Sequence, residues 1–251
     1  MKVGSVQRCE KSYKFSWNLK YSCDTIDSYT KIKLRKIKTE SMETTKFYDL
    51  QDMARIGCND CKGCSACCQG MGDSVVLTPY DVHVLAVHLN MSVDALFQEW
   101  LQLTIVDGLL QPSMAMNGVG ERCHALNHQG RCSIHGFRPS ICRLFPLGRQ
   151  YTEDGIRYFV LEDACPALGK TKVKISKWVE RTEFKEHEVF LQQWHAFKKQ
   201  CLVKMEEIQD ENYHKQLFML VLQLFFRKPY TEGRFYAEFL ERLAQASEIL
   251  T

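Results

Sequence analysis

Residues 57–70 read Gly57-Cys58-Asn59-Asp60-Cys61-Lys62-Gly63-Cys64-Ser65-Ala66-Cys67-Cys68-Gln69-Gly70. This stretch places five cysteines within eleven residues, and small residues between them allow tight turns. Two cysteines three positions apart can direct both sulfurs at one ion, and the backbone N–H groups of such turns stabilise thiolate charge. The stretch therefore indicates a metal-binding segment around which the fold is organised.

The adjacent pair Cys67 and Cys68 adds a constraint on that segment. Neighbouring side chains in an extended backbone point to opposite sides. One metal is therefore not expected to bind both thiols, and the pair favours either two metals or one metal beside a free thiol.

A second group of cysteines lies between residues 123 and 165. The turn-forming residues 127–130 predict a hairpin that brings Cys123 and Cys132 together. Pro139 can open a helical turn that projects Cys142. Cys165 follows a predicted strand at residues 157–161 and precedes a proline, as cysteines in iron–sulfur sites often do. Together the two groups give eight candidate metal ligands: Cys61, Cys64, Cys67, Cys68, Cys123, Cys132, Cys142 and Cys165.

The remaining cysteines and one histidine are weaker candidates. Cys9, Cys23 and Cys201 are isolated in the chain of 251 residues and are interpreted as ordinary thiols. Cys58 remains open as a ligand, and His135 is open as a ligand, a supporting hydrogen-bond donor or a turn residue. We make no assignment of catalytic residues.

The positive charge is concentrated at the N-terminus. Residues 1–41 contain ten Lys or Arg and four acids, a charge of +6, whereas the whole chain carries +3. The remainder is therefore net acidic. The leader is expected to be a loosely ordered basic extension with an alternating strand-like stretch at residues 31–38, and Met42 is an alternative start.

The combined cysteine pattern resembles a known family. Cys61-x2-Cys64-x2-Cys67-Cys68, followed by residues 132–146 with an Arg-Pro-x2-Cys-Arg motif, resembles the YkgJ-like CxxCxxCC cysteine-cluster family, a zinc- or iron-chelating domain. The resemblance also takes in residues 77–81 and spans about residues 55–170. It implies metal binding without fixing a reaction. A similar cluster occurs in flagellin lysine N-methylases, but this sequence lacks a glycine-rich cofactor loop after a strand.

Apolar periodicity outside the cysteines predicts helices. Thr78 and Ser92 are expected to cap two helices. The first carries Val82, Leu85, Ala86 and Leu89 on one face, and the second carries Val93, Leu96, Phe97 and Leu101. Residues 171–251 are expected to be entirely helical, with one buried stripe: Phe190, Trp194, Phe197, Cys201, Met205 and Ile208.

The predicted fold class is mainly α with small irregular β elements, a cysteine-rich metal-centred core plus C-terminal helices. The predicted parts are a basic extension (1–46), a cysteine-cluster metal-binding domain (47–170) and a helical C-terminal region (171–251).

These features predict a metal-binding protein whose clustered cysteines ligate an iron–sulfur cluster, of the 4Fe–4S type, or zinc, with a redox or sensing role. The alternatives are a methylase-like metal-dependent modifying enzyme and a zinc-stabilised interaction module. The expected partner is a protein, including a redox partner. A membrane is excluded because no apolar run is long enough, and nucleic acid is disfavoured because Lys198-Lys199 and Arg227-Lys228 are too sparse. The missing signal peptide favours a cytoplasmic location.

Overall fold

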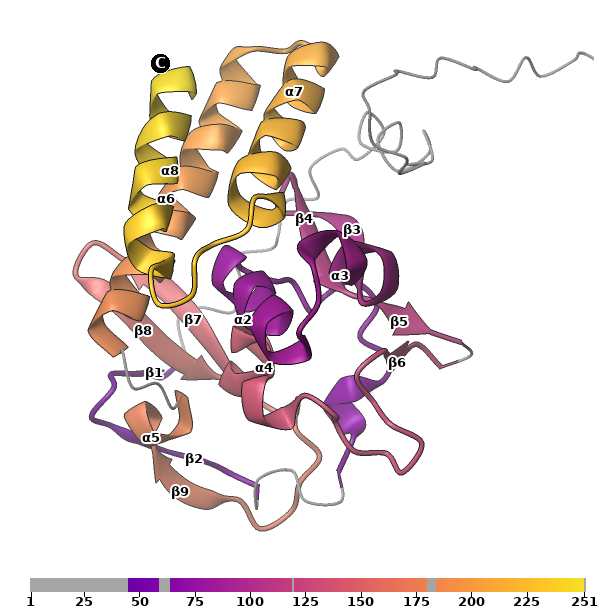
Figure 1. The fold of residues 1–251 in the computed structure, drawn as a ribbon. Coiled ribbons are helices and arrows are strands. Elements are labelled where there is room, and N and C mark those ends of the chain that lie inside the picture. Colours follow the sequence, from indigo (N-terminus) through magenta and orange to yellow (C-terminus); the bar gives the residue numbers. More distant parts are fainter. Residues whose placement is uncertain (1–44, 59–63, 119, 180–183, 251) are drawn as a thin grey trace, which may run out of the picture. The chain divides into compact units, whose positions relative to one another are not determined.

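The computed structural model of the chain describes residues 45–58, 64–118, 120–179 and 184–250 (Figure 1). Cys61, Cys9, Cys23, Met42 and the strand predicted at residues 31–38 lie outside the described residues.

The described residues form helices and strands that alternate along the chain. The helices are α2 (Pro79–Leu89), α3 (Val93–Glu99), α4 (Ser140–Leu144), α5 (Ile175–Val179), α6 (Phe184–Glu207), α7 (Glu211–Val221) and α8 (Phe235–Leu250), with short 3-10 helices η3 (Ala66–Cys68) and η4 (His135–Phe137) and a π-helix η5 (Leu222–Arg227). The strands are β1 (Phe47–Tyr48), β2 (Met53–Gly57), β3 (Leu101–Val106), β4 (Leu109–Met114), β5 (Met116–Asn117), β6 (Arg122–Cys123), β7 (Leu147–Thr152), β8 (Gly155–Val160) and β9 (Thr171–Lys174).

The strands pair into several small antiparallel sheets. One sheet has three strands in the order β1-β8-β7, and the pairs β2-β9, β3-β4 and β5-β6 form two-stranded ribbons. Strand β8 agrees with the strand predicted at residues 157–161.

The predicted fold class is wrong, because the structure is mixed α/β. Of the described residues, 46% are helical and 22% are in strands, and no metal group is assembled among them. The hairpin β3-β4 shows one cause. It turns at Asp107 and Gly108, which both have positive φ (50° and 81°). Asp-Gly between alternating apolar residues favours such a two-residue turn. The prediction of a mainly α fold did not take this signal into account.

The C-terminal region also differs from the all-helical prediction. Residues 171–174 form strand β9, whose partner β2 lies more than a hundred residues earlier in the chain. Long-range pairing supplies backbone hydrogen bonds that local periodicity cannot reveal.

The two predicted helix starts are confirmed. The side chain of Thr78 accepts a hydrogen bond from the backbone N–H of Asp81, and the Asp81 carboxylate accepts from the N–H of Thr78, which completes a capping box. The side chain of Ser92 accepts from the N–H of Ala95. Helix α3 ends at Glu99, earlier than predicted, because strand β3 begins at Leu101.

Aromatic side chains hold the long helices together. In Figure 1, α6 runs beside α8, and the predicted stripe on α6 is buried except for Ile208, which is 40% exposed just beyond the helix end. The rings of Phe190 and Phe239 lie 4.7 Å apart in an edge-on contact. Tyr80 of α2 extends this cluster, since its ring lies 5.0 Å from that of Phe235. The C-terminal helices therefore pack on the first helix of the cysteine region.

A buried guanidinium fixes the turn between η5 and α8. Arg242 is 3% exposed and donates hydrogen bonds to the carbonyls of Leu224 (3.0 Å), Lys228 (2.6 Å) and Pro229 (2.6 Å). Its guanidinium also lies 3.6 Å from the centre of the Tyr230 ring. Because no following helical turn offers these carbonyls a backbone N–H, Arg242 donates their hydrogen bonds.

Replacing Arg242 by methionine is expected to lower the free energy of unfolding by about 3 kcal/mol, because the buried carbonyls lose their donor. Chemical denaturation measures the change. Arg234→Met is the control, since Arg234 is exposed and its pair with Glu241 spans 4.0 Å; exposed pairs contribute little. Equal effects of the two substitutions would contradict the role of Arg242.

Among the described residues, no helix combines the length needed to cross a bilayer with sufficient apolar character.

Candidate metal centre

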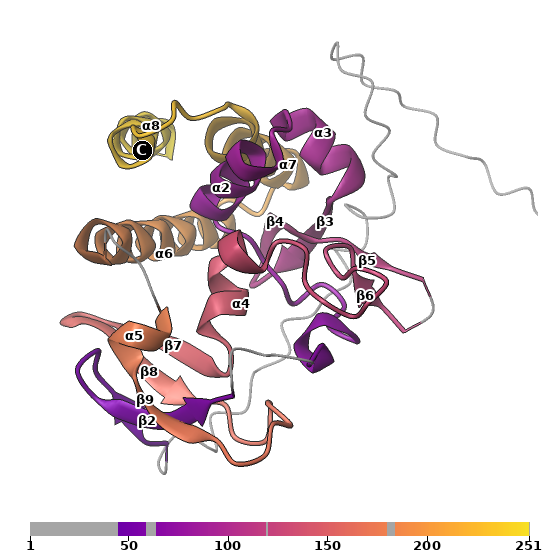
Figure 2. The same ribbon diagram turned by 60° about the horizontal axis from the view of Figure 1, so that its bottom comes forward.

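Three separate segments bring cysteines together. Helix η3 carries Cys67 and Cys68, and the residue after it, Gln69, forms an antiparallel bridge with Arg122, next to Cys123. The N–H of Gly70 donates to the carbonyls of Gly120 and Glu121 at 3.2 and 3.1 Å. Figures 1 and 2 both show η3 beside β6 and the loop that follows it. The backbone thus joins the first cysteine group to the second.

The turn predicted at residues 127–130 is confirmed. The N–H of Gly130 donates to the carbonyl of Asn127 (3.0 Å), and the Asn127 side chain accepts from the N–H of Arg131 (2.8 Å). Cys132 then bridges back to Leu126. This places Cys132 on the returning arm, opposite the arm that begins at Cys123.

Helix α4 carries Cys142, and a buried carboxylate from α2 holds its start. One carboxylate oxygen of Asp81 accepts from both the N–H and the hydroxyl of Ser140, each at 2.7 Å. The other oxygen accepts from the N–H and hydroxyl of Thr78, at 2.9 and 2.8 Å. Asp81 is 3% exposed. A single side chain therefore caps α2 and fixes α4, two residues before Cys142.

The end of α4 is held from the opposite direction. The indole N–H of Trp178, on α5, lies 3.3 Å from the carbonyls of both Leu144 and Phe145. Both ends of the helix that presents Cys142 are thus anchored by other elements.

The thiols act on one another electrostatically. Cys68 donates a hydrogen bond that lowers the pKa of Cys67 to about 6, whereas the pKa of Cys68 is raised by the same bond and by burial. Burial raises the pKa values of Cys123, Cys132 and Cys142, and the other thiols of the group raise them further. The five thiols therefore share one electrostatic environment.

Arg138 places a positive charge next to this group. Its guanidinium favours the thiolate forms of Cys67 and Cys132 and so lowers their pKa values, against the opposing effect of burial. Nη1 of Arg138 also contacts both ring nitrogens of His135, with 2.9 Å to Nδ1. The structure thus places His135 beside Arg138.

The other candidate cysteines occupy different environments. Cys64 is exposed, Cys58 is partly buried, and Cys165 is buried. Cys201 lies within α6 at 0% exposure, and burial raises its pKa to about 12, which keeps this thiol protonated at neutral pH.

The arrangement fits a metal in its chemistry, although it is not a closed site. Among the residues the structure describes, no three His, Cys, Asp or Glu side chains lie close enough together to hold an ion. The donor set is nevertheless rich in thiols, which are the ligands of iron–sulfur clusters and of structural zinc. Binding would require the sulfurs to converge, which couples metal binding to folding.

Sequence reasoning recognised Thr78 as a cap but missed Asp81 as the residue that joins α2 to α4. A signal was present, since a capping box has its acidic residue three positions after the Ser or Thr cap. The second role, toward Ser140, has no local signal because 59 residues separate the two side chains.

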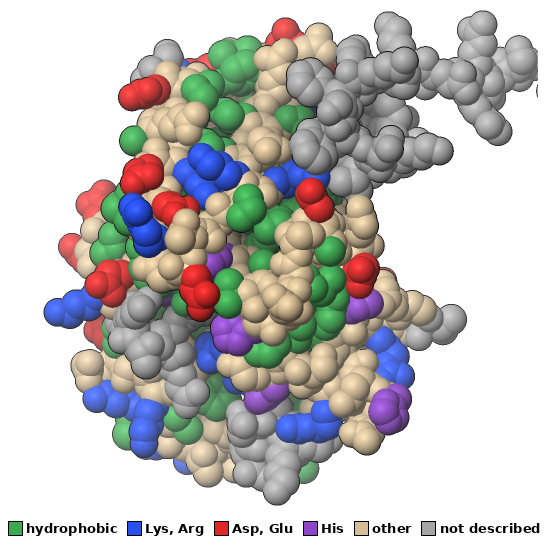
Figure 3. Space-filling model, in the orientation of Figure 1, with side chains coloured by type: hydrophobic (Ala, Val, Ile, Leu, Met, Phe, Trp, Pro, Cys, Tyr) green, Lys and Arg blue, Asp and Glu red, His purple; other side chains and the backbone are tan. Residues whose placement is uncertain are grey.

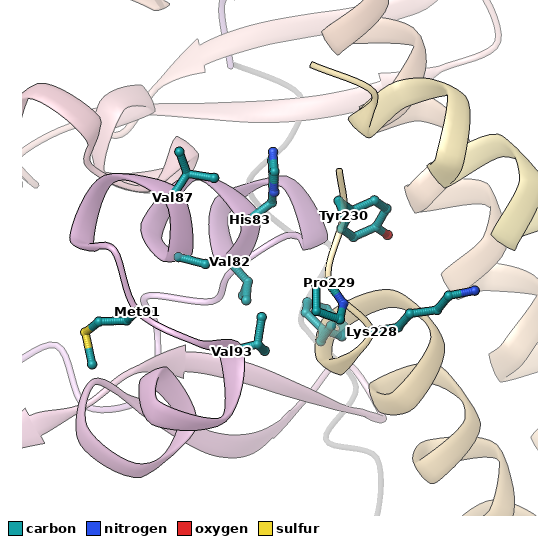
Figure 4. Close-up of a pocket in the computed structure, with 10 residues that line it drawn as sticks. Val82, His83, Val87, Met91, Val93, Lys228, Pro229 and Tyr230 are labelled. Atoms are coloured by element: carbon teal, nitrogen blue, oxygen red, sulfur yellow. The ribbon is translucent and has the colours of Figure 1, made fainter. Parts of the chain in front are cut away.

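A cavity of about 160 Å³ lies away from the cysteines, between α2 and the segment that follows η5 (Figure 4). It is lined by Val82, His83, Ala86, Val87, Met91, Val93, Phe226, Lys228, Pro229 and Tyr230. Burial lowers the pKa of His83, and the His83 ring stacks 5.6 Å from that of Phe235. Since the lining is mainly aliphatic and contains no cysteine, this cavity is not the metal site.

Comparison with known proteins supports the metal-binding interpretation. Residues 60–166 match the model of the CxxCxxCC family, described as "Putative zinc- or iron-chelating domain". No curated protein and no solved structure gives a significant match. The matched range contains all eight candidate cysteine ligands. Residues 60–166 of this chain are therefore similar to the CxxCxxCC domain, whose description supports metal binding in general.

Proposed function

We propose that the clustered cysteines ligate a 4Fe–4S cluster and that the protein serves electron transfer or sensing. The observation that carries the proposal is the group formed by Cys67, Cys68, Cys123, Cys132 and Cys142. Three segments supply these thiols, and the pKa of each thiol is shifted by at least one other thiol of the group. Four thiolates complete such a cluster, and the group has one to spare.

The donor set favours iron–sulfur chemistry over a mixed site. The charged groups that shift the pKa values of Cys67, Cys132 and Cys142 are other cysteines, arginines and Asp81, and His135 contacts Arg138. A bound cluster would supply one-electron chemistry. The chain's own contribution is to hold the thiols on anchored segments, to place the charge of Arg138 beside them and to limit their exposure to solvent.

Metal and sulfide analysis of the full chain tests this proposal. Protein purified without oxygen is expected to be brown and to contain iron with acid-labile sulfide. Colourless protein with stoichiometric zinc and no sulfide would reject the iron proposal and favour a structural zinc site. A Cys201→Ala variant serves as a matched control, because it removes a thiol that lies in the helical core.

Metal binding is expected to depend steeply on pH. For a site formed by Cys67, Cys123, Cys132 and Cys142, the last three have raised pKa values and Cys67 is already a thiolate above about pH 6. Binding at pH 7.5 should therefore release about three protons per metal ion. The affinity should fall about a thousandfold for each unit by which the pH is lowered, since protons compete for each thiolate.

Titration of metal-free protein with Zn²⁺ in buffers of different ionisation enthalpy measures the protons released. We expect the number of protons released to stay at about three after Cys201→Ala and to fall after Cys132→Ser. Binding without proton release would contradict this assignment of the thiols.

A further inference from the structure

The β2-β9 ribbon presents positive side chains on one face. In its register, Arg55 lies opposite Lys172 and Met53 lies opposite Lys174. Residues directly opposite each other share a face, as do residues two apart in one strand. Ala54 and Ile56 are buried at 2% and 0% exposure on the other face. We name Arg55, Lys170, Lys172 and Lys174 the basic ribbon, since Lys170 continues the alternation before the strand.

The cations of the basic ribbon have no acidic partner among the described residues. The two carboxylates that precede β2 are used elsewhere. Asp49 pairs with Arg157 at 3.4 Å, and Asp52 accepts from the N–H of Asp49 at 2.8 Å. Arg55 directs its guanidinium to the carbonyl of Lys170 at 3.3 Å. Like charges directly opposite each other in a ribbon are destabilising, so an anionic partner would relieve a cost that the free protein retains.

The spacing and composition of this face identify the partner's chemistry. Alternate residues of a strand are about 6.7 Å apart, so Lys172 and Lys174 form part of a regular row of cations. Met53, 55% exposed, is the large apolar side chain that accompanies them. A protein partner requires an apolar or aromatic core at the interface, which this face does not offer. A phosphate backbone is bound by a row of cations without such a core.

We propose that the basic ribbon binds the sugar–phosphate backbone of a nucleic acid without reading its sequence. In Figure 3, Lys and Arg side chains are visible in the lower left, where Figure 1 places α5 and β9. The sparse pairs Lys198-Lys199 and Arg227-Lys228 do not by themselves predict nucleic-acid binding. Arg55 and Lys172 come from strands far apart in the chain, so their pairing emerges only in the fold. The inference does not rest on the metal centre, since none of these residues is a candidate ligand.

Fluorescence anisotropy with a labelled 20-nucleotide single-stranded RNA of mixed sequence tests the proposal on the full chain. The variant Lys172→Glu/Lys174→Glu is compared with Lys204→Glu/Lys215→Glu, which changes the net charge equally on α6 and α7. The first variant is expected to fold, because Lys172→Glu places opposite charges across the ribbon from Arg55. Both melting temperatures are recorded as a check.

We expect the ribbon variant to bind RNA about tenfold or more weakly at moderate salt. The control variant should bind RNA with an affinity near that of the unmodified protein. Loss of two phosphate contacts should also make the slope of log affinity against log salt shallower by about 1.4. Equal weakening by both variants, or no weakening by either, would overturn the proposal. If oligoglutamate competed as effectively as unlabelled RNA of equal charge, the proposal would be overturned in favour of an acidic protein surface as the partner.

Discussion

Replacing Cys142 by serine is expected to abolish stoichiometric metal binding. Removing a residue that hydrogen-bonds to a metal ligand already lowers metal affinity about 10–100-fold. Removing a ligand itself should lower the affinity further. Cys142 lies in the short helix α4, where its thiol interacts with Cys123, Cys67 and Cys132. Because metal binding is coupled to folding, the melting temperature of the loaded protein should fall as well.

Two controls separate the loss of metal from simple damage to the fold. After chelation, the melting temperatures of the unmodified protein and of Cys142→Ser should converge, because neither then holds metal. Cys201→Ala should keep its metal while losing some stability, since it leaves a small void in the helical core. Full metal content in Cys142→Ser would remove this residue from the ligand set.

The second large effect is expected for Asp81→Ala. The carboxylate of Asp81 accepts four hydrogen bonds from Thr78 and Ser140 at 2.7–2.9 Å and is 3% exposed. Its removal leaves buried donors without an acceptor, which should lower the free energy of unfolding by about 4 kcal/mol. Metal affinity should fall as well, because Ser140 begins the helix that presents Cys142.

Asp210→Ala is the matched control for Asp81. Asp210 also caps a helix, accepting from the N–H of Asn212 at 2.7 Å, but it is exposed. Loss of an exposed cap typically costs about 1 kcal/mol, and metal affinity should not change. Denaturation and Zn²⁺ titration of both variants measure the two effects. The proposed link between α2 and α4 would be wrong if Asp81→Ala destabilised the protein no more than Asp210→Ala.

Features that depend on neighbouring residues could be predicted from the sequence. Thr78 and Pro79 fixed the start of α2, and Asn127 and Gly130 fixed the turn before Cys132, because capping and turn formation are decided within four residues. The buried stripe on α6 followed from helical spacing in the same way.

Features that depend on distant pairing could not be predicted in this way. Strand β9 forms because β2 supplies its hydrogen bonds, and no local pattern indicates that partner. The contact between Asp81 and Ser140 is equally non-local. The cysteine spacing indicated metal ligands, but how the thiols are shared among sites depends on the fold and on Cys61, which lies outside the described residues.

X-ray absorption at the metal edge of the full chain, purified without oxygen, tests the central claim most directly, because it reports the atoms bound to the metal. The account predicts bound iron with sulfur neighbours alone at about 2.3 Å, the distance typical of metal–thiolate bonds. A first shell of nitrogen or oxygen, or protein that folds fully without binding any metal, would contradict it.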